Sequence, residues 1–401
     1  MTDNRKMHLK FGSRAVHAGE RPPQRDFVPI ATPIYAASSF VYDDLEQMDA
    51  ALGGAEGVFV YSRYGNPTVE AMEAVVAALE EQEAALGVGS GMAAVNLALL
   101  ACCRAGGRVV ASRDLYGASV KLLDAIYRSL GVETTFVDIL DMEAYEAALS
   151  QGNVQAVIAE TISNPLLRVT DIQAVAERAH SIGARLIVDN TFATPYLVRP
   201  GLLGADYVVH SSTKYLGGHG DVTAGVIATS SALRAELNDF NKATGGIVSP
   251  FDAWLVLRGI KTLPLRMERQ CRTAAFIADW MLHHPKLEWV YYPGLAGHES
   301  HQTARDQFPK GMYGAMISFE IRNGNRDSVF RFLRALEMIA PATTLGDVYS
   351  LVLYPIMSSH RALTPAQRAE VGIGEGLIRL SVGIEDPVDI ISDLERALDA
   401  I

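Results

Sequence analysis

The sequence predicts an α/β fold whose large domain holds a mostly parallel, helix-covered sheet, followed by a smaller C-terminal α+β domain. Two observations support this prediction. Between residues 108 and 214, short apolar runs alternate with helical segments, which is typical of parallel strands joined by crossover helices. Beyond about residue 265 the strand-like runs become half polar, which favours a second and smaller domain.

Composition and charge exclude several classes of protein. A chain of 401 residues is long enough for two or three domains, and its 49% hydrophobic and 20% charged residues are ordinary for a globular protein. The net charge of −11 argues against a nucleic-acid partner and against an anionic membrane surface. Cys102, Cys103 and Cys271 lack the spacing of metal ligands, so we expect no metal site and no disulfide framework.

The N-terminal residues predict an arm rather than a domain. They lack the apolar core of a signal peptide, and no run in the chain approaches the roughly 18 apolar residues that span a bilayer. We therefore expect a cytoplasmic protein without a membrane partner. Residues 1–60 contain proline clusters, among them Pro22 and Pro23, and little periodic pattern. An arm of this length is expected to pack on its own body or on a partner subunit.

The segment after the arm predicts a helix and an anion site. Apolar residues recur at helical spacing after Asn66, so a helix is expected to begin near Pro67. A glycine-rich stretch then leads into a buried helix over 92–103. Backbone N–H groups at such a helix start attract anions, which makes Ser90, Gly91 and Met92 candidate phosphate-binding residues. A single Gly-Ser-Gly turn is common, so this motif alone is a weak signal.

Strands and helices alternate through the centre of the chain. The expected strands cover 108–112, 133–138, 154–160, 184–189 and a short run at 207–209, and the expected helices cover 117–130, 141–150 and 171–182. In a parallel sheet, ligands bind beyond the carboxyl ends of the strands. The polar residues that follow the strand-like runs are Tyr116, Glu160, Asn164, Asp189, Ser211, Thr213 and Lys214. Their convergence predicts a single site at one edge of the sheet.

Lys214 is the centre of this predicted site. The hydroxyls of Ser211 and Thr213 beside it suit a phosphate, and its amine suits a carbonyl. A lysine that forms a Schiff base with a phosphorylated aldehyde is the signature of pyridoxal phosphate enzymes, which also need a carboxylate for the pyridinium nitrogen. Asp189, at the end of a neighbouring strand, is the candidate carboxylate. Taken singly, the Ser-Ser-Thr-Lys run is equally compatible with a polar turn and Asp189 with a helix cap.

The C-terminal half predicts a helix-rich segment and then a smaller domain. Residues 250–284 are helical in pattern, and the basic residues along them indicate a solvated basic face: Arg258, Lys261, Arg266 and Arg269. Residues 315–322 alternate as a half-exposed strand, 327–336 are amphipathic, and 377–383 alternate again. This order of strand, helix and strand is the basis for the expected α+β domain.

An ordered series of motifs resembles the Cys/Met-metabolism family of pyridoxal phosphate enzymes, which includes cystathionine γ-synthases, cystathionine γ-lyases, cystathionine β-lyases, methionine γ-lyases and homoserine sulfhydrylases. The resemblance covers nearly the whole chain. Its motifs are Tyr-Ser-Arg-Tyr-Gly-Asn-Pro-Thr (61–68), Gly-Ser-Gly-Met-Ala-Ala (89–94), Leu-Tyr-Gly (115–117), Glu-Thr-Ile-Ser-Asn-Pro (160–165), Val-Asp-Asn-Thr-Phe (188–192), Ser-Ser-Thr-Lys-Tyr-Leu-Gly-Gly-His-Gly-Asp (211–221), Arg-Gly-Ile-Lys-Thr-Leu (258–263) and Ile-Arg-Leu-Ser-Val-Gly-Ile-Glu (378–385).

The resemblance implies the aspartate-aminotransferase-like fold, which is fold type I of the pyridoxal phosphate enzymes. It implies an arm over 1–60 that contacts a neighbouring subunit, a cofactor-binding α/β domain with a mostly parallel seven-stranded sheet over 61–264, and a C-terminal α+β domain over 265–401. It further implies a homotetramer, built as a dimer of dimers, with active sites shared between subunits. The expected ligands are pyridoxal 5'-phosphate and a small amino-acid substrate.

The resemblance also implies roles for individual residues. Lys214 would hold the cofactor and act as the base, and Tyr116 would stack on the ring and carry a proton near the leaving sulfur. Asp189 would pair with the pyridine nitrogen and Asn164 would lie by the ring oxygen. The phosphate ligands would be Ser90, Gly91, Met92, Ser211 and Thr213 within the subunit, and Tyr61 and Arg63 from the neighbour. The substrate would be bound by Arg379 through its carboxylate, and by Thr344 and Tyr61.

The reaction is less well defined than the cofactor. Methionine γ-lyases carry a cysteine where this chain has Ala118 and a Lys-Asp pair where it has Asn241 and Lys242, and cystathionine enzymes carry a glutamate where it has Thr343. The motifs at 217–221 and 345–347 resemble those of methionine γ-lyases and sulfhydrylases. We expect a carbon–sulfur lyase that acts by γ-elimination on methionine, homocysteine or cystathionine. The alternatives are γ-replacement on an activated homoserine and a non-catalytic module that only holds the cofactor.

Overall fold

The computed structural model describes residues 9–19, 29–53, 57–309, 311–358, 361 and 364–401. Its centre is a seven-stranded sheet with the order β1-β7-β6-β5-β4-β2-β3, in which β2 to β6 run parallel and β7 is antiparallel to both of its neighbours. The strands are β1 (Ala84–Val88), β2 (Arg108–Ser112), β3 (Glu133–Val137), β4 (Val154–Glu160), β5 (Arg185–Asp189), β6 (Tyr207–Ser211) and β7 (Gly225–Thr229). The predicted mostly parallel, seven-stranded sheet is confirmed.

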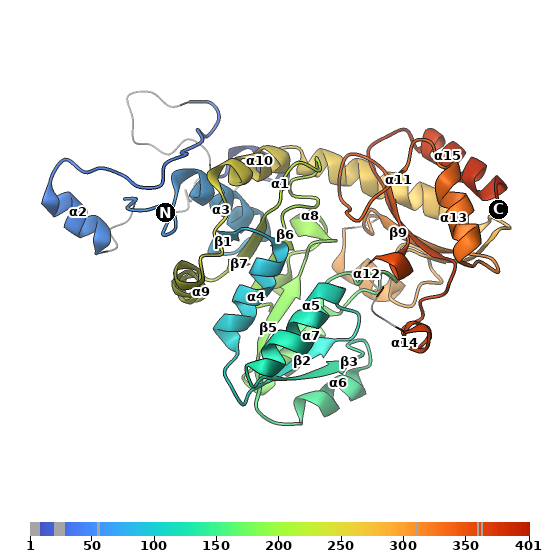
Figure 1. The fold of residues 1–401 in the computed structure, drawn as a ribbon, viewed down its shortest axis with the longest axis horizontal. Helices are drawn as coiled ribbons and strands as arrows, with labels where there is room; N and C mark the ends of the chain where they lie inside the picture. The colour runs from blue at the N-terminus through green and yellow to red at the C-terminus, as the bar shows by residue number, and fades with distance from the viewer. Residues whose placement is uncertain (1–8, 20–28, 54–56, 310, 359–360, 362–363) are drawn as a thin grey trace.

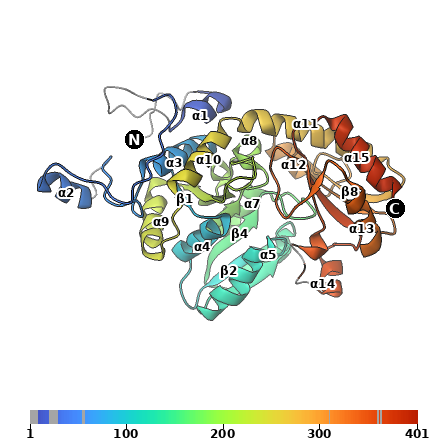
Figure 2. The same ribbon diagram turned by 45° about the horizontal axis from the view of Figure 1, so that its top comes forward.

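Helices cover both faces of this sheet (Figures 1 and 2). Successive residues of a strand point to opposite faces, and in β5 Leu186 and Val188 join one apolar cluster while Ile187 joins the other. The helices of the large part are α3 (Pro67–Glu80), α4 (Gly91–Cys102), α5 (Gly117–Lys121), α6 (Met142–Leu149), α7 (Ile172–Ser181), α8 (Thr194–Leu197), α9 (Ser231–Thr244) and α10 (Pro250–Ile260). The predicted helix over 117–130 is present as a helical run over 117–129, in which the π-helical stretch η1 (Leu122–Tyr127) follows α5.

The C-terminal part is built on a second sheet. Its order is β10-β11-β12-β9-β8, and an apolar cluster joins it to α11, α13 and α15. Its elements are α11 (Leu263–Leu282), β8 (Leu287–Tyr291), α12 (His301–Gln307), β9 (Met316–Ile321), α13 (Arg326–Ala335), β10 (Ala340–Pro341), β11 (Leu351–Leu353), α14 (Pro365–Glu370), β12 (Leu377–Ser381) and α15 (Pro387–Asp399), with short 3-10 turns at Pro200–Leu203 (η2) and Pro355–Met357 (η3). The smaller α+β unit expected from the sequence is therefore present.

Two expectations about the C-terminal half are wrong. The strand predicted to be half exposed, β9, is buried along almost its whole length between β12 and β8. Its polar Ser318 faces the protein, where Oγ donates a hydrogen bond to the carbonyl oxygen of Pro165 at 2.6 Å. The predicted solvated basic face does not include Arg266, which is 4% exposed and donates to the carbonyl oxygens of Tyr215 and Gly259 at 2.8 and 2.9 Å. In both cases a polar side chain faces another part of the protein instead of water.

The N-terminal segment is only partly packed on the body. The helix α1 (Phe11–His17) lies against α3, where Arg14 donates to the carbonyl oxygen of Ala78 at 2.8 Å. The helix α2 (Leu45–Leu52) projects away from the body in both ribbon views. Pro22 and Pro23, on which the arm was predicted, lie outside the described residues. Within the described ranges, no helix combines the length and apolar character of a membrane span.

Candidate active site

Lys214 lies just beyond β6, at the carboxyl edge of the parallel strands. Its Nζ donates a hydrogen bond to Oγ1 of Thr344 at 2.8 Å, so the loop between β10 and β11 is brought to the large sheet. Burial lowers the pKa of the Lys214 amine, the charge of Arg379 acts in the same direction, and Asp347 opposes the shift. An amine with a lowered pKa is a better nucleophile and base near neutral pH.

Arg379, on β12, joins Lys214 through the same loop. Its Nη1 donates to Oδ1 of Asn164 at 2.8 Å, and its Nη2 lies 3.4 Å from the carbonyl oxygen of Thr344. Arg379 is 3% exposed, and burial lowers its pKa to about 10, which leaves it charged at neutral pH. Its buried Nε has no hydrogen-bond partner among the described residues. A buried guanidinium with an unused donor suits a ligand carboxylate.

Asp189 occupies the end of β5, beside the strand that leads to Lys214. Its Oδ1 accepts a hydrogen bond from the backbone N–H of Thr191 at 2.9 Å. Burial raises the pKa of Asp189, while the hydrogen bonds from Thr191 and the charge of His210 oppose the shift. No ion pair to this carboxylate is present in the described part of the chain. A protonated pyridine nitrogen would supply the missing cation, so the residue fits the expected cofactor.

The start of α4 approaches the end of β6 closely enough to form an anion site. A Cβ atom built on Gly91 would lie 2.6 Å from Cβ of Ser211, so only glycine fits there without movement. Ser90 caps α4, its side chain accepting from the backbone N–H of Ala93 at 3.1 Å. The N–H groups of this helix end and the Ser211 hydroxyl therefore lie together, as a phosphate requires.

The other two predicted phosphate ligands have partners within the chain. Met92 is in the first turn of α4, and its Sδ lies 3.8 Å from Oγ of Ser119. Oγ1 of Thr213 accepts from the backbone N–H of Ala224 at 3.1 Å. Its O–H donates to the carbonyl oxygen of Ala224 at 3.3 Å, so the Thr213 hydroxyl is tied to the residue before β7 within one chain.

Tyr116 follows β2 and begins α5. Its backbone N–H donates to Oε1 of Glu160 at 2.6 Å, while its side chain is 45% exposed. Burial raises the pKa of Glu160 well above its ordinary value, and the charge of Asp189 acts in the same direction. Since β4 and β5 pair Glu160 with Asp189, the tyrosine backbone is tied to the strand next to Asp189. Its ring is accessible to a ligand.

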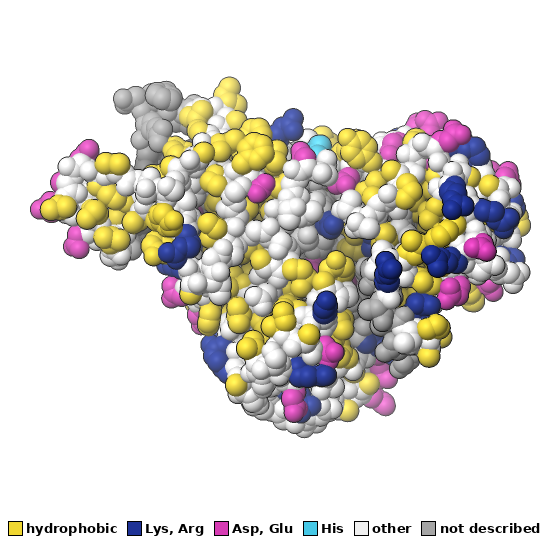
Figure 3. Space-filling model, viewed as in Figure 1, with side chains coloured by type: hydrophobic (Ala, Val, Ile, Leu, Met, Phe, Trp, Pro, Cys, Tyr) yellow, Lys and Arg dark blue, Asp and Glu magenta, His cyan; other side chains and the backbone are white. Residues whose placement is uncertain are grey.

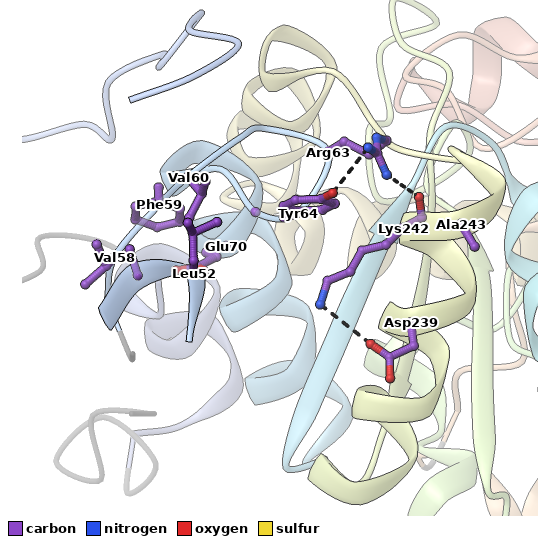
Figure 4. A pocket seen from close by; sticks show the side chains of 12 residues that line it. Leu52, Val58, Phe59, Val60, Arg63, Tyr64, Glu70, Asp239, Lys242 and Ala243 are labelled. Carbon is purple, nitrogen blue, oxygen red and sulfur yellow. Dashed lines mark hydrogen bonds and ion pairs between the residues drawn. The ribbon is translucent and has the colours of Figure 1, made fainter. Parts of the chain in front are cut away.

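Tyr61 and Arg63 belong to a different region of the molecule. Arg63 donates to the carbonyl oxygen of Lys242 at 2.5 Å and lies 4.7 Å from the ring centre of Tyr64. These contacts lie beside a cavity of about 520 Å³ between the arm and α9 (Figure 4). The residues around this cavity include none of the Lys214 group. Within one chain, the two residues are therefore not brought to the other predicted site residues.

Sequence reasoning assigned no role to Asp347, which the structure places in the site. Asp347 is 3% exposed, its Oδ1 has no hydrogen-bond partner among the described residues, and its charge raises the pKa of Lys214. Burial raises the pKa of Asp347 itself, and the charge of Lys214 opposes that shift. The sequence signal was an acid directly after Gly346, whose φ of 80° marks a tight turn.

A second overlooked feature is a buried polar group behind Asp189. Nε2 of His210 lies 2.6 Å from Oε1 of Glu80, and Nδ2 of Asn190 donates to the same oxygen at 3.0 Å. All three side chains are at most 1% exposed. His210 was hidden in an apolar strand, and Glu80 is an acid at the end of a helix with a largely apolar surface. No cluster that would suit a metal ion occurs within the described ranges.

The fold and these residues together define a pyridoxal-phosphate-dependent enzyme of fold type I. The lysine beyond a strand end suits the aldehyde of this cofactor, and the buried carboxylate on the neighbouring strand suits its ring nitrogen. The helix start beside a serine suits its phosphate.

Comparison with known proteins identifies the family. The model of the Cys/Met metabolism PLP-dependent enzymes matches residues 12–399, and the chain belongs to this family. It is 42% identical over 398 residues to an L-methionine gamma-lyase of Porphyromonas gingivalis, covering 98% of each chain. It is 39% identical over 392 residues to an O-succinylhomoserine sulfhydrylase of Pseudomonas aeruginosa, covering 98% of this chain and 96% of the relative. A solved cystathionine gamma-lyase of Lactobacillus plantarum superposes with a TM-score of 0.91 at 37% identity, covering 98% of this chain and 99% of that one.

Proposed function

We propose that this protein is a carbon–sulfur lyase that catalyses γ-elimination on a sulfur amino acid. The reaction consumes methionine, homocysteine or cystathionine and one water. It releases 2-oxobutanoate, ammonia and a thiol, which is hydrogen sulfide when the substrate is homocysteine. The observation that carries the proposal is the contact of Lys214 Nζ with Thr344 Oγ1 at 2.8 Å, while the carbonyl oxygen of the same Thr344 lies 3.4 Å from Nη2 of Arg379. Thr344 therefore contacts both Lys214, the proposed base, and Arg379, the proposed carboxylate-binding group.

Binding and proton transfer are assigned to the residues of this group. Arg379 binds the substrate carboxylate, and Asn164, which accepts from Nη1, fixes the plane of the guanidinium. Lys214 removes the Cα proton and then moves a second proton from Cβ, which allows the γ-substituent to leave. Thr344 orients the Lys214 amine through its hydroxyl before substrate binds. Tyr116 supplies a proton to the leaving sulfur from its exposed phenol.

The remaining residues hold the cofactor. When bound, pyridoxal phosphate acts as the electron sink that stabilises negative charge at Cα and Cβ. Asp189 keeps its pyridine nitrogen protonated, and the ring of Tyr116 packs over its face. The phosphate is bound by Ser90, Gly91, Met92, Ser211 and Thr213. The fit is supported by the close approach of Gly91 to Ser211 and by the buried Asp189 carboxylate described above.

A second candidate function is γ-replacement on an acylated homoserine. It is favoured by the sulfhydrylase relative and by the chain's departure from the methionine γ-lyases at Ala118. A replacement enzyme needs a thiol as second substrate, whereas a lyase needs only water. The two functions therefore differ in what they require and in what they release.

Product release distinguishes the two functions. The purified, cofactor-loaded protein is given L-methionine, L-homocysteine, L-cystathionine, or O-succinylhomoserine with and without cysteine, and 2-oxobutanoate and thioether are measured. We expect 2-oxobutanoate from at least one of the three sulfur substrates without added thiol. The γ-elimination proposal would be wrong if none of the three sulfur substrates reacted and thioether formed only from O-succinylhomoserine plus cysteine. The protein would then be a γ-replacement enzyme.

We also propose that the chain assembles as a homotetramer made of two active dimers. Support comes from the arm and the segment that follows it, because Val41 of the arm is 99% exposed and Tyr61 and Tyr64 just beyond it are 42% and 45% exposed. In this proposal, Arg63 and Tyr61 serve the cofactor phosphate of the neighbouring subunit, and Tyr61 also lines its substrate site. The division into an arm (1–60), a cofactor domain (61–264) and a C-terminal domain (265–401) belongs to the same proposal, and the cytoplasmic location stays a prediction.

A further inference from the structure

Arg168 connects three segments that lie far apart in the sequence. It lies on the returning half of the loop that follows β4, where Ile162 pairs with Val169, and it is 8% exposed. Its Nη1 donates to Asp114 at 2.6 Å, its Nη2 to Asp138 at 2.9 Å and its Nε to Glu299 at 3.0 Å. All three nitrogens that carry its N–H groups are therefore used by carboxylates.

Each of these carboxylates comes from a different segment of the chain. Asp114 is in the turn between β2 and α5, just before Tyr116, and Asp138 follows β3. Glu299 lies between β8 and α12, in the C-terminal part. Burial disfavours the charged form of Arg168, but Asp138 and Asp114 raise its pKa overall, so the group stays charged at every working pH. Removing the partners of a buried charged group is strongly destabilising, so these contacts are expected to hold Arg168 in place.

The same loop carries Asn164 at its other side. Asn164 accepts from Arg379, and the carbonyl oxygen of Pro165 accepts from Ser318 of β9. The backbone of the loop is closed by the hydrogen bond from Ser163 N–H to the Arg168 carbonyl oxygen at 2.9 Å. The loop therefore has Arg379 on one side and the turn that precedes Tyr116 on the other.

We propose that Arg168 is a positioning residue that fixes Tyr116 relative to Asn164 and Arg379. It touches none of the reacting atoms, and it acts through Asp114. The assignment rests on the proposed role of Tyr116 in the γ-elimination. The backbone of Tyr116 is anchored at its N–H by Glu160, and Arg168 anchors the preceding turn through a side chain. Arg113 also ties this turn to Asp138, at 2.6 Å, but its side chain is more exposed than that of Arg168. When the buried tie through Arg168 is lost, the exposed ring is expected to lose its fixed orientation, while Arg379 keeps its carboxylate-binding geometry.

The main variant is Arg168→Met, compared with Arg168→Lys and Asp114→Asn in the cofactor-loaded protein. Arg178→Met is the control, since Arg178 pairs with the exposed Glu146 and with the carbonyl oxygen of Ala174, and lies outside the site. We expect Arg168→Met to lower kcat by about 10- to 100-fold, the usual cost of a misplaced catalytic group, with KM changed less than about threefold. Arg168→Lys keeps the positive charge but loses the forked geometry of the guanidinium, so its kcat is expected to lie between those of the wild type and Arg168→Met.

Two readouts do not depend on the lyase reaction. Visible circular dichroism of the bound cofactor reports the ring stacked against it, and amide hydrogen exchange reports the backbone of residues 113–121. Arg168→Met and Asp114→Asn are both expected to weaken the dichroism and to speed exchange in 113–121. Because the two residues act as one contact, the double variant is expected to be no worse than Arg168→Met.

The alternative outcomes are distinct. Lower thermal stability with unchanged exchange in 113–121 and unchanged dichroism would overturn the proposal and leave Arg168 a structural residue. Equal losses in Arg178→Met would overturn it as well. If Arg168→Met does not fold, Asp114→Asn carries the same test, and normal exchange there would contradict the assignment. If the protein proves to be a synthase instead, exchange and dichroism still decide the role of Arg168.

Discussion

The carboxyl edge of the large sheet and the region around Arg63 differ in how far their charged side chains are buried. At the sheet edge, Lys214 and Arg379 are largely withdrawn from water and have hydrogen-bond partners from the same chain. Around Arg63, the charge lies among exposed tyrosines and beside an open cavity (Figure 4). The space-filling view shows apolar side chains gathered on the projecting arm (Figure 3).

This difference indicates which half of the site a single chain completes. Buried charges need partners, and Lys214 and Arg379 have them within the chain. Among the described residues, Asp189 has no ion pair and Nε of Arg379 has no hydrogen-bond partner. These are the groups that the cofactor and the substrate would take, so a single chain supplies this half of the site. Exposed apolar and aromatic groups beside a basic residue are typical of a surface that another molecule covers. The contrast is in line with the proposed shared site, in which one chain supplies the Lys214 region, here called the finished half. The Arg63 region, here called the unfinished half, would be completed by a neighbouring subunit.

Removal of Lys214 has the largest expected effect on this comparison. Lys214→Ala deletes the group that is proposed both to hold the cofactor and to move the protons, so turnover is expected to fall by at least about 10⁴-fold. The measurement is 2-oxobutanoate release at saturating substrate. The control is Lys286→Ala, whose side chain pairs with Asp399 far along the C-terminal part and is expected to leave turnover unchanged. Undiminished turnover in Lys214→Ala would leave only the non-catalytic, cofactor-holding module.

Mixing two inactive variants tests the unfinished half. Arg63→Ala is expected to lower activity strongly, because the neighbour's cofactor phosphate loses its guanidinium. When Arg63→Ala and Lys214→Ala subunits are dissociated together and reassembled, a mixed dimer regains one intact site. Random pairing then restores about a quarter of the wild-type activity. The activity of the mixture is measured against each variant carried through the same treatment.

A mixture that shows no restored activity would contradict the proposal that Arg63 completes the site of a neighbouring subunit. If subunits exchange, as a tag on one variant can verify, and activity stays at the level of the single variants, then Arg63 does not serve a neighbour. The cavity between the arm and α9 would then need a different occupant. Restoration well above the level of either variant would support a shared site.

Much of the fold and of the sheet edge could be predicted because local pattern and topology agree there. The apolar runs that end in Glu160, Asp189 and Ser211 form adjacent strands, so their ends meet as expected. The anion site was predicted from glycines before a helix, and Gly91 indeed approaches Ser211. The roles of Tyr61, Arg63 and Arg379 came only from the family resemblance, since no periodicity distinguishes such residues from surface ones.

The errors share one physical cause. Alternation of polar and apolar residues shows that two faces of a strand differ, but it does not show that the polar face meets water. The polar residues of β9 and β12, Ser318 and Arg379, face the large part of the protein and bond to Pro165 and Asn164. Arg266 was assigned to a solvated face for the same reason. Contacts between distant segments, such as those of Arg168, leave no local pattern in the sequence.

The smallest expected effect concerns how well the finished half is sealed from water. Burial raises the pKa of Glu160 well above its ordinary value of 4.5, with Asp189 acting in the same direction. Above pH 4.5 the unfolded chain releases this proton while the native chain still holds it. The native state then binds more protons than the unfolded state, so the stability supplied by Glu160 falls as pH rises toward its native pKa.

Glu160→Gln removes this titration and keeps an oxygen that can accept from the Tyr116 N–H. The midpoint of thermal unfolding, measured from pH 4.5 to 8 for the loaded protein, is expected to fall more steeply with pH in the wild type than in the variant, by about a few degrees over the range. Other titrating groups are common to both proteins and cancel in the difference. Glu146→Gln, which alters an exposed carboxylate, is expected to run parallel to the wild type. Parallel curves for Glu160→Gln would mean that water reaches Glu160 and that the sheet edge is less closed than its contacts indicate.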